Sequence, residues 1–350
     1  MKVFSASEAV WPALERTYAY LFRPFKAETF LKLAAVATIS EGFMVSFHFS
    51  VPNAFPFEID TGALRSILLA PDFLPVTILG AMALFLTGVY CLYLVIRLRF
   101  AFIHSLIHQT RGFRDAARLY SVEAERFYTA IVLVWLSFLV VVAVAIVLFV
   151  LTAYTVVSTR TPEGKLDPGN FLILFFPSAA IVFTLLLAVS VAQIVLNDFI
   201  LPHMAIEGAT FSRAWAEVRL RMAAHKETFA SYFVLRLAMP LIAGVILGVV
   251  AWFIGFMAFG ILGMSAAGFT AMLDGVPGIR AYLLIAVQMF FVLLGLGVGL
   301  VIAVCVAGPI GVFMRSYALF FYGGHYKALG NLLNPPASAP AAPDPATGYP

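Results

Sequence analysis

The polar residues most able to do chemistry in this chain interrupt long apolar stretches. Glu41 comes about eleven residues into the first stretch, which at ~1.5 Å per helical residue is near the middle of a bilayer. A charged side chain there costs roughly 2.5–3.5 kcal/mol, and burial disfavours a charged carboxyl group unless water or a cation is near. Glu41 could therefore carry a proton or a cation between helices. Alternatively, it is a protonated or hydrogen-bonded glutamate at a helix break beside Gly42, or the span starts later in the chain.

Four more polar side chains complete the candidate intramembrane polar site. Gln193, Asn197 and Asp198 follow one another at the end of the fourth apolar stretch, and Gln288 lies in the sixth. Amides within membranes commonly hydrogen-bond neighbouring helices, for about 0.6 kcal/mol each, which favours a structural role for Gln193 and Gln288. Asp198 and Arg99 hold matching places in two parts of the chain, each directly before a Phe, so a pairing between them stays open.

The histidine spacing suggests a metal site but supplies too few ligands. His104 and His108 share one helical face, and His203 stands 99 positions after His104. Zinc needs at least a third protein ligand, and there is no HExxH motif, so contact with lipid headgroups is the better interpretation. The sequence also has no GxSxG, GxxxxGK[ST] or CxxC motif. We therefore expect no metal, no cofactor, no catalytic residue and no enzymatic activity.

Stretches without charged residues indicate the elements that hold these side chains. The longest, residues 127–159, has no Asp, Glu, Lys, Arg or His, and about 20 apolar residues suffice to cross a bilayer. The composition agrees, because only 11% of the residues are charged against ~25% in soluble domains. We predict an all-α integral membrane protein with six transmembrane helices. Their predicted positions are residues 30–51, 73–96, 127–157, 171–197, 232–262 and 281–313.

The distribution of basic residues predicts the orientation. Seventeen of the 22 Lys and Arg residues fall before the apolar stretch at residues 33–51, between the second and third spans, between the fourth and fifth, or after the sixth. Short cytoplasmic loops are rich in Lys and Arg, so both termini should be cytoplasmic, in a multi-pass protein of the cell inner (cytoplasmic) membrane. The net charge of +4 is small and mostly on this side, which indicates contact with anionic headgroups and not with nucleic acid.

The segments before the first, third and fifth spans share a pattern that indicates an internal repeat. Each has an amphipathic helix and then a short charged segment that closes on Phe30, Phe127 or Phe229, which are 97 and 102 positions apart. We predict interfacial amphipathic helices near residues 8–25, 108–124 and 206–224. Three such units would repeat in parallel, around an axis along the membrane normal. Chance convergence of hydropathy is the alternative.

Arginines on and near these helices form a candidate cytoplasmic basic face. Its residues are Arg97, Arg99, Arg111, Arg114, Arg118, Arg213, Arg219 and Arg221. Such a face braces the bundle against the inner leaflet, or it docks a membrane or cytoplasmic protein partner. We expect residues 1–333 to form a single membrane domain, followed by a disordered Pro- and Ala-rich tail at 334–350.

Short motifs in three places carry a resemblance to known families. The chain resembles a broad group of uncharacterised prokaryotic six-span membrane proteins at residues 11–32, with Phe-Arg-Pro-Phe at 22–25, at residues 197–202 followed by 211–229, and at residues 309–317. That group resembles the membrane portion that precedes the catalytic domain in some glycerophosphodiester phosphodiesterases. The resemblance covers most of residues 8–330 and implies an all-helical membrane module. No counterpart of the catalytic domain is expected after Leu333, so no catalytic residue carries over.

Three classes of function fit these features. We favour a non-enzymatic multi-pass membrane module that scaffolds a partner or organises lipid. The alternative is a transporter or channel for a small solute, ion or lipid, which Glu41 and the Gly-rich fifth and sixth spans would suit. An intramembrane enzyme would need a cluster of nucleophile, base or metal ligands that the sequence does not show. A water-accessible path to Glu41 would favour transport, and a tightly packed centre would favour the module.

Overall fold

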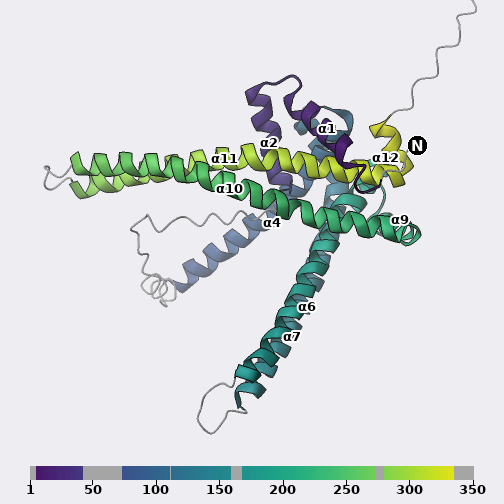
Figure 1. Cartoon of the computed structure of the whole chain (residues 1–350), viewed down its shortest axis with the longest axis horizontal. Helices are drawn as coiled ribbons and strands as arrows, with labels where there is room; N and C mark the ends of the chain where they lie inside the picture. Colours follow the sequence, from purple (N-terminus) through teal and green to yellow (C-terminus); the bar gives the residue numbers. More distant parts are fainter. Residues whose placement is uncertain (1–4, 42–72, 111, 159–167, 273–279, 335–350) are drawn as a thin grey trace, which may run out of the picture. The chain divides into compact units, whose positions relative to one another are not determined.

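The computed structural model describes residues 5–41, 73–110, 112–158, 168–272 and 280–334, and every regular element in these ranges is a helix (Figure 1). The all-α class is therefore confirmed for this part of the chain. Residues 42–51 of the first predicted span, Arg111 and the predicted tail from residue 335 onward lie outside it. The elements are α1 (Val10–Phe22), α2 (Ala27–Glu41), α4 (Leu74–His108), α5 (Phe113–Leu119), α6 (Ser121–Ser158), α7 (Pro168–Ile194), the π-helical segment η2 (Val195–Ile200), α8 (Leu201–Glu207), α9 (Phe211–Ala224), α10 (Lys226–Met272), α11 (Arg280–His325) and α12 (Lys327–Leu333).

The chain divides into two compact units that alternate along the sequence. The first, here called the α6–α9 unit, comprises Met1–Ser7, Arg118–Phe233 and Ala318–Pro350. The second, the α1–α4 unit, comprises Glu8–Ala117 and Val234–Tyr317. Each polar cluster and the groove described below lie within one unit.

Four helical stretches are long and apolar enough to cross a membrane. They are Leu74–His108, Ser121–Leu151, Phe176–Glu207 and Gly297–His325, and they correspond to the second, third, fourth and sixth predicted spans. The fifth predicted span lies inside α10, a helix of 47 residues, and the described part of the first lies in α2. A helix suits a membrane-crossing segment because it satisfies the backbone hydrogen-bonding groups within the segment itself.

The candidate spans expose most of their apolar surface, and packing is concentrated at helix ends. Only 6% of the most apolar stretch is buried in α4 and in α6, against 18% in Phe176–Glu207 and 28% in Gly297–His325. The packed end of the α6–α9 unit is aromatic. The Phe199 ring lies 5.2 Å from the Phe229 ring and 5.0 Å from the Tyr322 ring, between centroids. These contacts hold η2 against the start of α10 and the end of α11.

Small residues let α2 and α11 approach closely in the α1–α4 unit. A Cβ added at Gly308 would lie 2.4 Å from the Cβ of Ala34, and one at Gly311 would lie 3.1 Å from a carbonyl oxygen of α2. Glycines of this kind let two helix backbones come together. Arg315 lies one turn beyond Gly311 on α11, and Glu41 lies one turn further along α2. The close contact therefore brings these two charged residues to each other.

The helices expected at the membrane surface are shorter than predicted. α5 covers only part of residues 108–124, because α4 continues to His108 and α6 begins at Ser121. α1 turns its apolar face outward, with Trp11 73% exposed and Tyr18 54% exposed. An exposed aromatic face is typical of a helix that lies at the headgroup level.

Candidate functional site

Glu41, the carboxyl group that the sequence singled out, belongs to a buried ion-pair cluster of the α1–α4 unit. Its Oε1 accepts a 2.7 Å hydrogen bond from Nε of Arg315 and a second one from Nη2 of the same residue. Nη2 of Arg236 lies 4.0 Å from Oε2 of Glu41. Glu41 is 8% exposed and Arg315 is 1% exposed, so the pair is removed from solvent. Taking one partner from such a pair leaves an uncompensated buried charge, at about 3–5 kcal/mol.

A third arginine, Arg99 of α4, contacts the main chain of α2 beside this ion pair. Its Nε donates a 2.6 Å hydrogen bond to the carbonyl oxygen of Ser40, the residue before Glu41. Arg99 is buried, although the sequence placed it on an exposed basic face. Guanidinium groups from α4, α10 and α11 therefore meet beside Glu41, the last described residue of α2.

The three arginines border the charge-free stretches of their own helices. Arg236 directly precedes residues 237–273, Arg315 directly follows residues 281–314, and Arg99 lies three positions after residues 73–96. The sequence placed Glu41 near the middle of a span. Its ion-pair partners lie next to the borders of the charge-free stretches of α10 and α11, and the depth of Glu41 in the bilayer stays a prediction.

A second polar cluster, centred on His203, lies in the α6–α9 unit. Nη1 of Arg221 donates a 2.8 Å hydrogen bond to Nε2 of His203, and the hydroxyl of Tyr322 lies 2.6 Å from the same nitrogen. Because arginine can only donate, Nε2 is an acceptor and the ring proton of the neutral histidine is on Nδ1. Arg221 also pairs with Glu217 at 3.3 Å. Its guanidinium lies 4.8 Å from the centre of the Tyr326 ring.

Tyr326 closes this cluster from the start of α12. Its hydroxyl donates a hydrogen bond to Oε1 of Glu207. Burial, and then this hydrogen bond, raise the pKa of Tyr326 well above that of an ordinary phenol. His203 and Arg221 were noted in the sequence for other reasons, a metal site and a basic face. The two tyrosines carried no signal, because aromatic residues are common throughout the chain.

Asp198 and Asn197 lie in η2, a π-helical segment that the sequence did not predict. The Tyr232 hydroxyl donates a 2.8 Å hydrogen bond to Oδ2 of Asp198, which is 1% exposed. Nδ2 of Asn197 donates to the main-chain carbonyl of Gln193 at 2.9 Å. The pairing of Asp198 with Arg99 stays a prediction. Short π-helical insertions frequently occur at functional sites, and here the insertion sets the buried polar end of α7.

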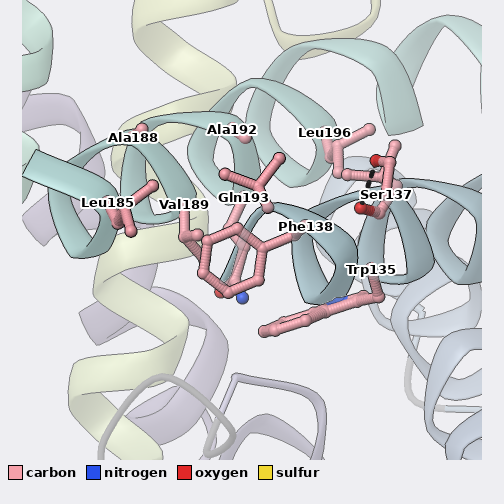
Figure 2. Close-up of a pocket in the computed structure, with 11 residues that line it drawn as sticks. Trp135, Ser137, Phe138, Leu185, Ala188, Val189, Ala192, Gln193 and Leu196 are labelled. Carbon is pink, nitrogen blue, oxygen red and sulfur yellow. Dashed lines mark hydrogen bonds between the residues drawn. The ribbon is translucent and has the colours of Figure 1, made fainter. Parts of the chain in front are cut away.

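A groove of about 320 Å³ lies between α6 and α7, whose facing side chains are drawn in Figure 2. Gln193 is its amide-bearing residue, and most of the remaining lining is aliphatic or aromatic. The lining residues are Val134, Trp135, Ser137, Phe138 and Val141 on α6, and Leu185, Ala188, Val189, Ala192, Gln193 and Leu196 on α7 and η2. From the sequence, Gln193 was interpreted as a residue that hydrogen-bonds a neighbouring helix, and no feature of the sequence indicated the groove.

The remaining candidates are not gathered into one of these clusters. Arg97 is half-buried, and its Nη2 donates to the carbonyl oxygen of Ala117 at 2.9 Å. Gln288 lies in α11, with its side chain outside the described residues. Among the described residues, no group of three or more His, Cys, Asp or Glu side chains could hold a metal ion. Among the described members of the predicted basic face, the exposed ones are Arg114, Arg118, Arg213 and Arg219.

A comparison with protein families covers both clusters and the groove. The model of a family of unknown function (DUF7544) matches residues 4–332. The chain belongs to this family. No curated protein and no solved structure matches it. The family assigns no activity, so the functional argument rests on the contacts of the residues themselves.

Proposed function

We propose that this chain is a non-enzymatic, multi-pass membrane module that organises lipid at the inner face of the cytoplasmic membrane, where it can also hold a protein partner. The observation that carries this proposal is the separation of surfaces along the candidate spans. Their apolar lengths are exposed, while charged and aromatic groups pack at helix ends. An exposed apolar helix surface of this extent is stable in contact with lipid chains or with other apolar helices. The proposed module would bind both, the lipid directly and a protein partner through its membrane helices.

The ion-pair cluster supports this function over transport. A carboxyl group that carries a proton or a cation must exchange partners during each cycle. Glu41 instead receives two hydrogen bonds from Arg315 and has Arg236 beside it. In this arrangement the carboxyl group fastens α2 to α11. Because its arginine partners border apolar stretches, we place Glu41 at the hydrocarbon boundary and not at the centre of the bilayer.

For the topology we propose six spans, in three parallel helix-hairpin units, with both termini in the cytoplasm. Three junctions support the repeat, because α1, α5 and α9 each end a few residues before a longer helix begins. The left-handed residues that end α4 and α8, Gln109 and Gly208, are 99 positions apart, which agrees with the period of the sequence pattern. The resemblance to the membrane portion of some glycerophosphodiester phosphodiesterases is consistent with a module of this kind.

In the proposed function the exposed arginines of α5 and α9 attract anionic lipid headgroups. A basic residue near an anionic membrane surface contributes about 1 kcal/mol, so a few of them suffice to favour anionic headgroups. The exposed aromatic face of α1 would hold the surface helices at the headgroup level. Together these groups would concentrate anionic lipid around the spans.

The test measures which lipids surround the protein in vesicles of mixed phosphatidylglycerol and phosphatidylcholine. Energy transfer from the tryptophans to labelled phosphatidylglycerol should exceed transfer to equally labelled phosphatidylcholine, most clearly at low salt. Changing Arg114, Arg118, Arg213 and Arg219 to Gln should remove this preference. The matched control changes the same four residues to Lys, which keeps the charge, and should retain the preference.

Two results would contradict the proposal. One is equal transfer to the two lipids at low ionic strength. The other is uptake of a solute into the vesicles that is lost in a folded Glu41→Gln variant, because that result assigns the carboxyl group to a transport path.

A further inference from the structure

The groove between α6 and α7 lies inside two candidate membrane spans. Its lining runs from Val134 to Val141 on α6 and from Leu185 to Leu196 on the opposite side. Both stretches fall within Ser121–Leu151 and Phe176–Glu207, so the groove is surrounded by hydrocarbon in a bilayer. Its contents must therefore be apolar over most of their length.

The dimensions of the groove identify the occupant as a single chain. Leu185 and Leu196 are eleven positions apart, which is ~16.5 Å along a helix. A volume of 320 Å³ over that length corresponds to a mean cross-section of about 19 Å². A circle of this area is about 4.9 Å across, slightly more than the ~3.5–4.0 Å at which carbon atoms pack, so the groove fits one hydrocarbon chain. A helix of ~10 Å diameter has a cross-section of about 79 Å², so a helix of a second copy could insert only single side chains and would not fill the length of the groove.

Small side chains create the space. Ala188 and Ala192 stand one turn apart on α7, and Trp135 and Phe138 belong to the α6 side of the groove (Figure 2). Larger side chains at the two alanines would fill the hollow between the helices. The groove is therefore specified by two residues that can be changed without touching either polar cluster.

Gln193 adds a polar requirement to this apolar site. Its main-chain carbonyl accepts the hydrogen bond from Asn197, but none of the described residues hydrogen-bonds its side-chain amide. An amide surrounded by hydrocarbon is unfavourable without a hydrogen-bonding partner. The occupant should therefore present an acceptor or donor near Gln193 and an apolar chain beyond it.

We propose that the groove holds one acyl chain of a glycerophospholipid and that the Gln193 amide donates to the ester carbonyl at the head of that chain. Leu196 lies two positions before the buried Asp198, at the polar end of the helix, whereas Leu185 lies deeper in the apolar stretch. The ester group therefore occupies the Leu196 end, and the chain extends toward Leu185. This inference rests on the proposed lipid-organising function and gives it a defined site.

The first experiment uses the full chain in phosphatidylglycerol vesicles. Trp11, Trp215 and Trp252 are changed to Phe, so that Trp135 is the only tryptophan and reports on the groove. Phosphatidylglycerol brominated on its acyl chains should quench Trp135. Ala192→Leu fills the groove and should lose much of this quenching, and Ala188→Leu is a second variant with the same expected loss. The control Ala180→Leu, an exposed residue of the same helix outside the lining, should leave the quenching unchanged.

The second experiment tests the hydrogen bond. Lipids that stay bound to the protein through detergent purification are counted by mass spectrometry, with diester and dialkyl-ether phosphatidylglycerol supplied in equal amounts. One intramembrane hydrogen bond corresponds to about a threefold preference for the ester lipid. Gln193→Leu should abolish this preference and retain the chain.

Unchanged quenching in folded Ala192→Leu and Ala188→Leu would overturn the proposal. A dimer of the unmodified protein that is lost in these variants would also overturn it, because the groove would then hold a second copy. Equal retention of the ester and ether lipids by the unmodified protein would overturn the role of Gln193. These outcomes are separate from the function itself, because the preference for phosphatidylglycerol that depends on the exposed arginines can persist with an empty groove.

Discussion

Removing the carboxylate of Glu41 should destabilise the α1–α4 unit far more than removing an exposed carboxylate from the same helix. Glu41→Gln leaves Arg315 buried without its ion-pair partner, which costs about 3–5 kcal/mol. Glu28 of α2 pairs with Lys32 at 2.6 Å, but the two side chains are 80% and 70% exposed. Water screens such a pair, so Glu28→Gln should leave the unfolding transition where it is. The two variants make the same chemical change in one helix.

Thermal unfolding in a mild detergent, followed by helix content and by tryptophan fluorescence, measures the difference. Glu41→Gln should lower the midpoint by several degrees. Arg315→Met should do the same, because Glu41 then loses its two hydrogen bonds and keeps only the longer contact of 4.0 Å with Arg236. The double variant removes both charges of the pair. Its loss should be smaller than the sum of the two single losses by roughly 2–3 kcal/mol.

Two results would refute this reasoning. If Glu41→Gln and Glu28→Gln unfold at the same temperature, the ion pair does not hold α2 against α11. If the losses of the two single variants simply add in the double variant, Glu41 and Arg315 act independently, and the contact between them contributes nothing.

Three further predictions follow from single residues. In a background without the native cysteines, Arg114→Cys should react with an impermeant thiol reagent only from the cytoplasmic side and Ser158→Cys only from outside; reaction of both from one side would contradict the topology. Gly308→Ala should lower the free energy of unfolding by about 1–3 kcal/mol through overpacking, whereas Gly299→Ala, whose added Cβ meets nothing within 4 Å, should leave it unchanged; thermal unfolding midpoints measure the difference. Because the pKa of Tyr326 is raised in the folded state, the unfolded chain loses this proton first, near pH ~10. Stability should therefore fall as the pH rises through that value, and Tyr326→Phe should reduce the fall, as alkaline denaturation series would show.

The membrane-helix class could be predicted because it depends on composition alone. A charge-free stretch such as residues 127–159 is apolar whatever it packs against, and α6 covers most of it. Helix ends were harder to predict. α6 begins at Ser121, six positions before the charge-free stretch, because charged residues at the start of a membrane helix can reach water while the backbone stays helical. The same effect leaves only a short α5 between two long helices.

The partners of the candidate residues could not be predicted, because they depend on how helices cross. Glu41 stood out as a carboxyl group in an apolar stretch, yet Arg315 is 274 positions away in the sequence. The contact that joins them depends on Gly308 and Gly311. Nothing in the sequence distinguished Gly308 among the 25 glycines, and Gly311 was noted only within the motif at residues 309–317. Likewise, the hydrogen bond from the Tyr232 hydroxyl to Asp198 could not be predicted. Asp198 lies in the π-helical segment η2, and a π-helical turn shifts the direction of the side chains that follow it.

The two units place their strongest interactions in the same kind of location, and this bears on function. In the α1–α4 unit Glu41 contacts Arg315 and Arg236, two arginines that border the apolar stretches of α11 and α10. In the α6–α9 unit the His203 cluster and the aromatic contacts of Phe199 lie at the ends of α8, α9 and α11. Interactions at helix ends can fix the geometry of each unit while the apolar lengths stay available to lipid chains. In the proposed lipid-organising role these contacts keep each unit folded, and the exposed apolar length of its own helices is the surface that meets the lipid chains.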